Sequence, residues 1–423
     1  MTNPYLVLVT SGTAARIAGS AQRWGRTAVA VDTDNELFGV IGSADGDASP
    51  VLDHPAGEAH PITRAQRPVP GLWAVVPPGS HETHADARRI GRQLRPTAFD
   101  AFFADVPVQA RSAGTFVVAT RQPGAAQEWA AWIAGDFGLR PLDIDILPPP
   151  SFDPLPDLGA GWPVEDLDRP VVVVGVGSIG SAVAHALARY GVREMVLVDP
   201  DRLRRHNLVR HQNTRAAIGQ YKVDAMREAI GEQWPATRVT ALRASVIAGA
   251  DLMRPLFARS PLVICAADGV AARRTVSHLA WRAGSTAVFA CVLRDGALGE
   301  VLRVRPWPGT PCLLCTRAAL VKEGSFDPEP DLDAAYGTGE VHRPMTAIGS
   351  DLTMVAGLTA KLAVATLLEN AGHYEHVIRP DWAMIGLRLD RGAPEPFDLF
   401  PGQLHWLPAA DARPDCPTCG SQR

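Results

Sequence analysis

The most informative stretch of this sequence is Val171-Val172-Val173-Val174-Gly175-Val176-Gly177-Ser178-Ile179-Gly180. Four valines in a row are typical of a strand that is buried on both faces of a sheet. The glycines have the G-x-G-x-x-G spacing, and a helix is predicted from about Ser181 to Tyr190. Gly175 allows a tight turn, Gly177 lets a phosphate approach the backbone, and Gly180 lets the helix pack on the strand. The stretch predicts a nucleotide-binding turn, and the alternative is a glycine turn without a ligand.

Further apolar runs predict buried strands at Met195–Val198, Leu262–Cys265 and Ala287–Val292, with helices between them. Strands that alternate with helices indicate an α/β fold with a Rossmann-like, doubly wound sheet. Asp199 follows the strand Met195–Val198, about 20 residues after the glycines, where an acidic side chain can accept ribose hydroxyls. The same pattern occurs in NAD-binding proteins. The residues after Asp199 therefore have to show whether the bound nucleotide is NAD or another one.

Those residues form short motifs in a fixed order. They are Asp199-Pro200-Asp201, then Arg205-His206-Asn207-Leu208-Val209-Arg210-His211-Gln212, then Gly219-Gln220-Tyr221-Lys222-Val223, and finally Leu262-Val263-Ile264-Cys265-Ala266-Ala267-Asp268-Gly269. This order resembles the ThiF/MoeB family of adenylyltransferases, the bacterial relatives of ubiquitin-activating enzymes. The resemblance implies ATP-dependent adenylation of the C-terminal carboxylate of a small ubiquitin-like protein or peptide. The acyl-adenylate would then pass to sulfur, an amine or a partner's thiol.

The chemistry of that reaction asks for the residue types that the motifs supply. Attack of a carboxylate on the α-phosphate of ATP needs cations around the phosphates, for which Arg210 and Lys222 are candidates, with Asn207 as a neutral donor. Asp268 follows a sheet strand and is a candidate ligand for Mg²⁺, which prefers oxygen ligands. We therefore predict catalytic roles for Arg210, Lys222 and Asp268, and an ATP site made of Gly175, Gly177, Gly180, Asp199, Asp201, Asn207, Arg210, Lys222, Asp268 and Gly269.

Each of these residues also has an ordinary alternative. Arg210 and Lys222 could be solvated surface cations, Asp268 a helix N-cap and Asn207 a turn residue. The sequence also departs from the family pattern, because His211 stands where the family usually has glutamine. A family arginine that reaches the partner subunit's ATP is missing from Gly159-Ala160-Gly161-Trp162-Pro163. The resemblance implies a homodimer. Because this arginine is missing, it is open whether the partner subunit supplies one to the ATP.

Four of the six cysteines form two Cys-x-x-Cys pairs, Cys312 with Cys315 and Cys416 with Cys419. Four thiolates suit tetrahedral Zn²⁺, and a closed four-cysteine site is structural rather than catalytic. The alternative is reduced, free thiols. Cys265 and Cys291 lie in apolar runs and are predicted to be core residues. The segment from Thr316 to Met345 is acidic and glycine-rich, which predicts a mobile loop. Ubiquitin-activating enzymes that form thioesters carry their cysteine in this region, after the metal-bound pair. The segment contains no cysteine here, so the resemblance favours adenylation without a stable enzyme thioester.

Five prolines between Leu147 and Pro156 predict a connector. We predict an N-terminal domain of unknown role over residues 1–147, a Pro-rich linker over 148–160 and the adenylyltransferase domain over 161–423. The N-terminal domain is predicted to be a smaller α/β or α+β domain. Its predicted strands are Tyr5–Thr10, Ala28–Val31, Leu72–Val76 and Thr115–Ala119, and its predicted helices are Ala85–Leu94 and Ala125–Ala134. We interpret its histidines at 54, 60, 81 and 84 as solvated rather than metal-binding.

The bulk composition limits the remaining function classes. A net charge of −4 gives no overall basic field for nucleic acid. The longest apolar run, Met354–Leu368, is interrupted by Lys361, so we predict no transmembrane helix. Met1-Thr2-Asn3-Pro4 lacks the basic start of a secretory signal, and we expect a cytoplasmic protein.

Three functions remain to be compared. The first is the adenylyltransferase, with a small protein or peptide that has a free C-terminus as partner. The second is a non-catalytic scaffold or peptide-binding member of the same family. The third, an NAD-dependent oxidoreductase, is disfavoured by the cysteine pairs and by the cations Arg210 and Lys222.

Overall fold

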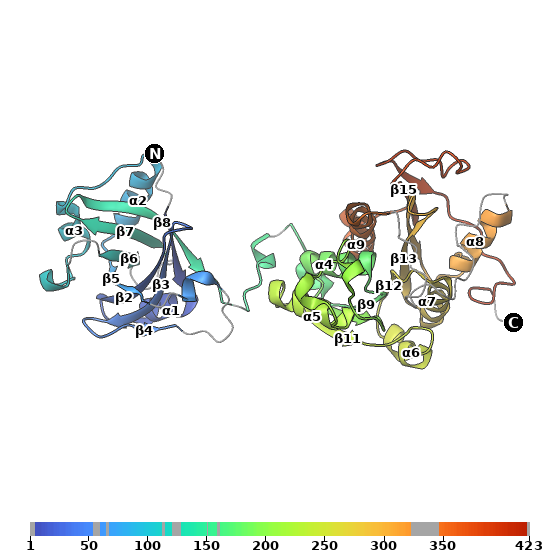
Figure 1. The fold of residues 1–423 in the computed structure, drawn as a ribbon, viewed down its shortest axis with the longest axis horizontal. Coiled ribbons are helices and arrows are strands. Elements are labelled where there is room, and N and C mark those ends of the chain that lie inside the picture. Colours follow the sequence, from blue (N-terminus) through green and yellow to red (C-terminus); the bar gives the residue numbers. More distant parts are fainter. Residues whose placement is uncertain are drawn as a thin grey trace. The chain divides into compact units, whose positions relative to one another are not determined.

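A computed structural model describes residues 5–53, 60–64, 67–111, 115–120, 128–149, 151–158, 161–322 and 347–420. The chain divides into two compact units, Met1–Phe152 and Asp153–Arg423 (Figure 1). Each unit has its own eight-stranded sheet and its own hydrophobic core. The N-terminal unit is therefore a folded domain in its own right rather than an extension of the sheet that carries the glycine motif.

The strands of the first unit close on themselves. Their order is β1-β8-β7-β6-β5-β2-β3-β4, and β1 also pairs with β3, which makes a ring of seven strands with β4 on the outside of β3. Closure leaves the ring without exposed edges. The elements are β1 Leu6–Thr10, α1 Ser11–Gly19, β2 Trp24–Asp32, β3 Leu37–Asp45, β4 Val51–Leu52, β5 Val69–Val75, α2 Ser80–Arg89, α3 Thr97–Phe102, β6 Phe116–Thr120, β7 Trp129–Gly135 and β8 Gly138–Leu147.

Strand β7 shows that the prediction of a helix over Ala125–Ala134 was wrong for the residues that the structure describes. Trp132 packs in the cluster beneath α2 and α3, whereas its neighbours Ala131 and Ile133 join the cluster inside the ring. The run is rich in alanine, which favours helix in isolation, but burial on both faces of a strand overrides that preference. The start of the predicted helix, residues 121–127, lies outside the described residues.

The helix predicted over Ala85–Leu94 is α2, which begins and ends five residues earlier. Its histidines, His81 and His84, are buried, so the prediction that they are solvated was wrong. The Nε2 atom of His84 lies 3.0 Å from the carbonyl oxygens of both Ala131 and Leu142. Burial lowers the pKa of His84 to about 4, so its ring is neutral near pH 7. The ring connects α2 to strands β7 and β8.

The second unit is a mixed sheet with the strand order β11-β10-β9-β12-β13-β14-β15-β16. The first five strands are parallel and the last three are antiparallel additions. The elements are β9 Pro170–Val174, α4 Ser178–Tyr190, β10 Glu194–Val198, α5 Lys222–Gln233, β11 Arg238–Leu242, α6 Ala250–Ala258, β12 Leu262–Cys265, α7 Val270–Ala283, β13 Thr286–Leu293, β14 Leu298–Val304, α8 Leu313–Lys322, α9 Gly349–Ala371, β15 Trp382–Gly386 and β16 Leu404–Leu407.

Helices cover both faces of this sheet (Figure 1). The core on one face lies beneath α4, α5 and α9, and the core on the other lies beneath α6, α7 and α8. The predicted Rossmann-like, doubly wound fold is thereby confirmed, with its four predicted strands in place. Helix α4 begins at Ser178, inside the glycine motif and three residues before the predicted start.

Two contacts attach the proline-rich segment to the second unit. Asp153 forms an ion pair with Arg193 at 2.5 Å. Leu155 is buried, and a Cβ added at Gly191 would lie 3.4 Å from its side chain. Residues 153–158 therefore pack against the second unit, whereas the predicted domain limits at 147 and 161 remain a prediction.

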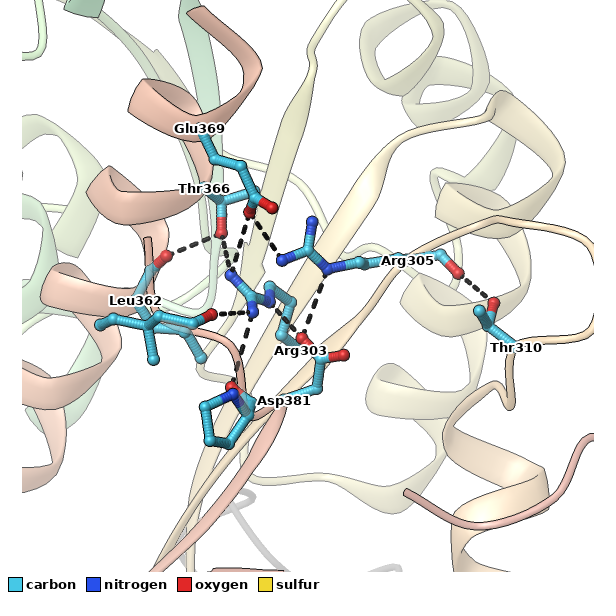
Figure 2. Close-up of polar contacts among 9 residues, drawn as sticks. Arg303, Arg305, Thr310, Leu362, Thr366, Glu369 and Asp381 are labelled. Carbon is cyan, nitrogen blue, oxygen red and sulfur yellow. Dashed lines mark hydrogen bonds and ion pairs between the residues drawn. The ribbon is translucent and has the colours of Figure 1, made fainter. Parts of the chain in front are cut away.

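Helix α9 is long and apolar enough to cross a membrane by length and composition, yet 67% of its most apolar window is buried in the protein. It packs along α4 in the larger core. Its C-terminal half also contacts two arginines of the chain segment at the end of β14 (Figure 2). Arg303 donates to Thr366 at 3.0 Å, and Arg305 pairs with Glu369 at 2.7 Å. Helix α9 is thus a core helix, fastened to the sheet by polar contacts.

Candidate nucleotide site and cysteine cluster

The candidate site lies where the chain changes direction across the sheet. Strands β10 and β12 pair with β9 on opposite sides, so the loops after these three strands meet at the carboxyl edge of the sheet. Ligands of open α/β sheets bind in the crevice at such a switch point. The glycine motif, Asp199 and Asp268 follow β9, β10 and β12 in turn, so the topology brings them to one edge.

Two of the three motif glycines are required by close packing. Gly175 has φ +84°, and a Cβ there would lie 2.6 Å from the Ala267 nitrogen. A Cβ at Gly180 would lie 1.8 Å from the carbonyl oxygen of Gly175. A Cβ at Gly177 would meet nothing within 4 Å. The open space at Gly177, next to the N-terminus of α4, is what close approach of a phosphate to the backbone needs.

The glycine loop is held on both sides of Val176. The Val176 N–H donates to Asp199 Oδ2 at 2.7 Å, and the Val176 carbonyl accepts from His211 Nε2 at 3.0 Å. The Nδ1 atom of His211 accepts from the Asn213 N–H at 3.1 Å, which places the ring proton on Nε2. Burial lowers the pKa of His211 to about 4, so the ring is neutral. Sequence reasoning noted His211 only as a departure from the family pattern and missed this role.

Lys222 lies beside the two acidic residues that follow β10. Its Nζ is 2.8 Å from Asp201 Oδ2 and 3.9 Å from Asp199 Oδ1. Asp199 is 6% exposed, and burial raises its pKa although the charge of Lys222 acts in the opposite direction. The structure therefore brings three of the predicted site residues together in one ion-paired group.

The other predicted residues differ in whether their polar atoms form hydrogen bonds within the protein. The Oδ1 atom of Asn207 accepts from the Arg204 N–H at 2.8 Å, which is the turn role considered for it. The Nε atom of Arg210 is buried and has no hydrogen-bond partner in the structure. Asp268 is exposed next to Ala267, the residue against which Gly175 packs. Gly269 rather than Asp268 occupies the N-cap position of α7, so the Asp268 carboxylate is not used as the helix cap.

The four paired cysteines form one cluster. Their sulfur atoms lie within 4.8 Å of one another, with Cys312 at 3.5 Å from Cys416 and Cys315 at 3.3 Å from Cys419. These distances are too long for disulfides. Zn–S bonds of about 2.3 Å in a tetrahedron place the sulfurs roughly 3.8 Å apart. The cluster therefore fits a four-coordinate zinc ion and ties the C-terminal segment to the start of α8.

The two remaining cysteines are buried strand residues. Burial raises the pKa of Cys265 to about 11 and that of Cys291 to about 12, which keeps both thiols protonated and unreactive near neutral pH. The acidic segment in which we predicted a mobile loop begins within α8, and its residues 323–346 lie outside the described residues. The mobile loop, and adenylation without a stable enzyme thioester, therefore remain predictions from the sequence.

Fold and loop together define a Rossmann-like α/β domain with a glycine loop at its switch point. The ThiF family model matches residues 167–384, about half of the sequence, and the chain belongs to the ThiF family. This match spans the glycine loop, the candidate cations and Asp268, but only the first of the two cysteine pairs. The family assignment made from the sequence motifs is confirmed.

Similar proteins match parts of this chain. The molybdopterin-synthase adenylyltransferase of Salmonella typhimurium is 30% identical over 149 residues, which are 35% of this chain and 58% of that protein. The tRNA threonylcarbamoyladenosine dehydratase of Bacillus subtilis is 42% identical over 74 residues, 17% of this chain and 29% of that protein. A crystal structure of E. coli MccB with AMPCPP and MccA has a TM-score of 0.46 at 17% identity, covering 61% of this chain and 68% of that one.

Proposed function

We propose that this protein uses ATP to adenylate the C-terminal carboxylate of a small protein or peptide, with release of pyrophosphate. The observation that carries the proposal is the meeting of the glycine loop, the group formed by Asp199, Asp201 and Lys222, and the spare polar capacity of Arg210 and Asp268 at one sheet edge. The matched adenylyltransferase of Salmonella typhimurium supports the reaction class. The chain spans 58% of that relative, so the activity of the whole protein is part of this proposal.

In the proposed reaction an oxygen of the substrate carboxylate attacks the α-phosphorus of ATP. The bond from that phosphorus to the bridging oxygen breaks, pyrophosphate leaves with the electron pair, and an acyl-adenylate forms. Arg210 and Lys222 stabilise the charge that develops on the phosphates, because fixed cations act most strongly where new charge appears. Phosphate binding would draw Lys222 away from Asp201, which is exposed and can then be solvated by water.

Asp268 is the residue that would hold Mg²⁺. Its exposed carboxylate lies at the carboxyl edge of the sheet and forms no ion pair or hydrogen bond with the described residues. Bound magnesium supplies positive charge to the phosphates of the nucleotide. Asp199, by contrast, already accepts the Val176 N–H, so its contribution to ATP binding includes holding the loop as well as contacting a ribose.

We place the metal of the cysteine cluster away from the chemistry. Zinc held by Cys312, Cys315, Cys416 and Cys419 would have no open position for a substrate, so its contribution is to the fold. The acceptor of the acyl-adenylate is a sulfur, an amine or a partner's thiol. Because Cys265 and Cys291 are buried and protonated, neither is assigned a thioester role.

The protein is also proposed to act as a homodimer. Support comes from exposed apolar side chains around the start of α9, where Val209 is 78%, Ile348 62% and Met354 47% exposed. Gly349 lies against Val209, so two of these side chains belong to adjoining segments beside Arg210. Sedimentation equilibrium tests the assembly: a mass of 45.1 kDa at all micromolar concentrations would contradict the dimer.

Exchange of labelled pyrophosphate into ATP tests the proposed reaction. Candidate peptides with free C-termini should support exchange, and the same peptides with amidated C-termini are the matched control. Calorimetry should show ATP binding that requires magnesium. If the protein binds no ATP, the scaffold function takes the place of the enzyme.

A further inference from the structure

An open hollow of about 510 Å³ lies next to the nucleotide site, and arginines form much of its wall. Arg202, Arg204 and Arg205 line it, together with Ile218 and Tyr221. From residue 202 to residue 223 the sequence contains five arginines and one lysine but no aspartate or glutamate. This local excess of positive charge contrasts with the chain's net charge of −4.

Two chain segments that line the hollow are paired through their backbones. Leu203 donates its N–H to the Gln220 carbonyl at 2.8 Å and accepts the Gly219 N–H at 2.9 Å. The ring of Tyr221, next to these paired segments, contacts two guanidinium groups, with Arg202 at 3.9 Å and Arg243 at 4.6 Å from its centre. Cation–π contact orders both arginines without neutralising them.

The arginines differ in whether an acid balances them. Arg243 pairs with Asp224 at 2.6 Å, outside the hollow. Arg202 donates to the carbonyl oxygen of Gly219 at 2.7 Å and forms no ion pair with the described residues. Arg204 and Arg205 are exposed, and no described carboxylate lies within ion-pair distance of either side chain. Three guanidinium groups therefore face one hollow with their charge uncompensated.

We propose that this hollow is a docking site for an acidic segment of the protein or peptide substrate. The inference rests on the proposed function for the identity of that partner. Carboxylates of the segment would pair with Arg204 and Arg205, while Ile218 offers an apolar contact beside them. Asp201 lines the same hollow and pairs with Lys222, so a segment docked here lies next to the phosphate-binding cations.

Charge and size favour a peptide over a nucleic acid. Binding of RNA or DNA relies on a basic surface that follows several phosphates. Here three arginines that form no ion pair with the described residues share one hollow, on a chain of net negative charge. A short acidic segment needs only two or three such contacts, and electrostatic complementarity gives it selectivity and a faster encounter.

Fluorescence anisotropy with a short, fluorescein-labelled polyglutamate peptide tests the site directly, without ATP. The variant Arg204→Glu/Arg205→Glu should weaken binding at least about tenfold, since it replaces two attractive charges by repulsive ones. The double variant Arg189→Glu/Arg259→Glu changes the net charge equally at exposed positions elsewhere in the same unit, and should bind as the wild type does. Wild-type affinity should fall as salt rises above about 0.1 M.

Three results would overturn the proposal. One is equal polyglutamate binding by the wild type and Arg204→Glu/Arg205→Glu. Another is no binding by the wild type at low salt. A third is that the wild type binds a single-stranded RNA of equal charge more tightly than polyglutamate, and that Arg204→Glu/Arg205→Glu loses this RNA binding. The hollow would then be a nucleic-acid site. Calorimetry of the wild type with ATP and magnesium separates the two proposals. If the wild type binds ATP but not polyglutamate, only the docking site fails. If it binds polyglutamate but not ATP, only the adenylation fails.

Discussion

Arginines at two edges of the second unit differ in whether the protein itself supplies partners for their polar atoms. Arg303, at the edge of the sheet opposite the glycine loop, has a side chain that is 0% exposed and pairs with Asp381 at 2.5 Å (Figure 2). Its other nitrogens donate to Thr366 and to the Ile378 carbonyl. Arg210, at the glycine-loop edge, keeps a buried Nε without a partner. The protein itself satisfies the polar atoms of Arg303, which we call the closed edge. The Nε atom of Arg210 has no partner, and we call its surroundings the open edge.

The difference indicates which polar groups serve the fold and which serve a ligand. A buried donor without a partner costs about 1–3 kcal/mol, and a bound ligand is one way to satisfy it. The charges of Arg303 and Arg305 are balanced within the protein, because Asp381 pairs with Arg303 and Glu369 pairs with Arg305. In the proposed function, the unused polar atoms of Arg210 and Asp268 would serve phosphate and magnesium. Variants at the two edges should therefore separate activity from stability.

The largest effect is expected at the open edge. Asp268→Asn and Arg210→Ala should each slow ATP–pyrophosphate exchange by about 10²–10³-fold, or roughly 3–4 kcal/mol, because each removes a charge placed for the transition state. The melting temperature should not change. Asp251→Asn, at a fully exposed acid of α6, is the control. Exchange at the wild-type rate in Asp268→Asn would show that the magnesium assignment is wrong.

Variants at the closed edge, around Arg303, should change the free energy of unfolding rather than the activity. Arg303→Met leaves Asp381 and Thr366 without their buried partner, and should lower the free energy of unfolding by about 3 kcal/mol. ATP affinity of the folded protein should stay the same. Urea unfolding and calorimetry measure the two quantities, and Arg189→Met is the exposed control. A loss of ATP affinity without a loss of stability would reverse the assignment of this group.

The cysteine cluster offers a second test of a structural role. We expect one zinc ion per chain, lost completely in Cys416→Ser, since a closed site needs all four thiolates. The variant should lose stability, whereas exchange activity per folded molecule should change little. Cys265→Ser is the comparison, because that buried cysteine lies outside the cluster. Protein purified without chelator that contains no zinc would refute the assignment.

The smallest effect concerns pH and the histidine that holds the glycine loop. Burial lowers the pKa of His84 and His211 to about 4, so both stay neutral in the folded state while the unfolded chain gains protons below about 6.5. Their contribution to stability is therefore complete above pH 6.5 and is lost as pH falls toward 4. His211→Gln keeps a donor for Val176 but does not titrate.

That substitution should reduce the decline of stability by about 1 kcal/mol per pH unit between pH 6.5 and 4. Equilibrium unfolding at several pH values measures the slope, and His405→Gln is the control. An unchanged slope in His211→Gln would mean that this histidine is not held neutral in the folded protein. Retained ATP affinity in His211→Gln but not in His211→Leu would support its role in positioning the loop.

Long-range packing of the N-terminal unit was where sequence reasoning failed. Its strands were partly predicted, but β7 was taken for a helix and His81 and His84 for solvated residues. Nothing near Trp129 indicates that both faces of that strand are buried, because the covering residues come from distant parts of the chain. Closure of the ring depends on β1 pairing with β3 and β8, which no local pattern encodes.

In the second unit the sequence alone determined four of the parallel strands with helices between them, the glycine turn and the two cysteine pairs. Those features depend on spacing between near neighbours, which fixes backbone conformation locally. Only the tertiary structure decided that His211 and Asp199 hold Val176 from two sides, that Arg303 is closed off while Arg210 is open, and that three arginines share a hollow. The physical reason is that hydrogen-bond partners and charge balance depend on which distant segments the fold brings together.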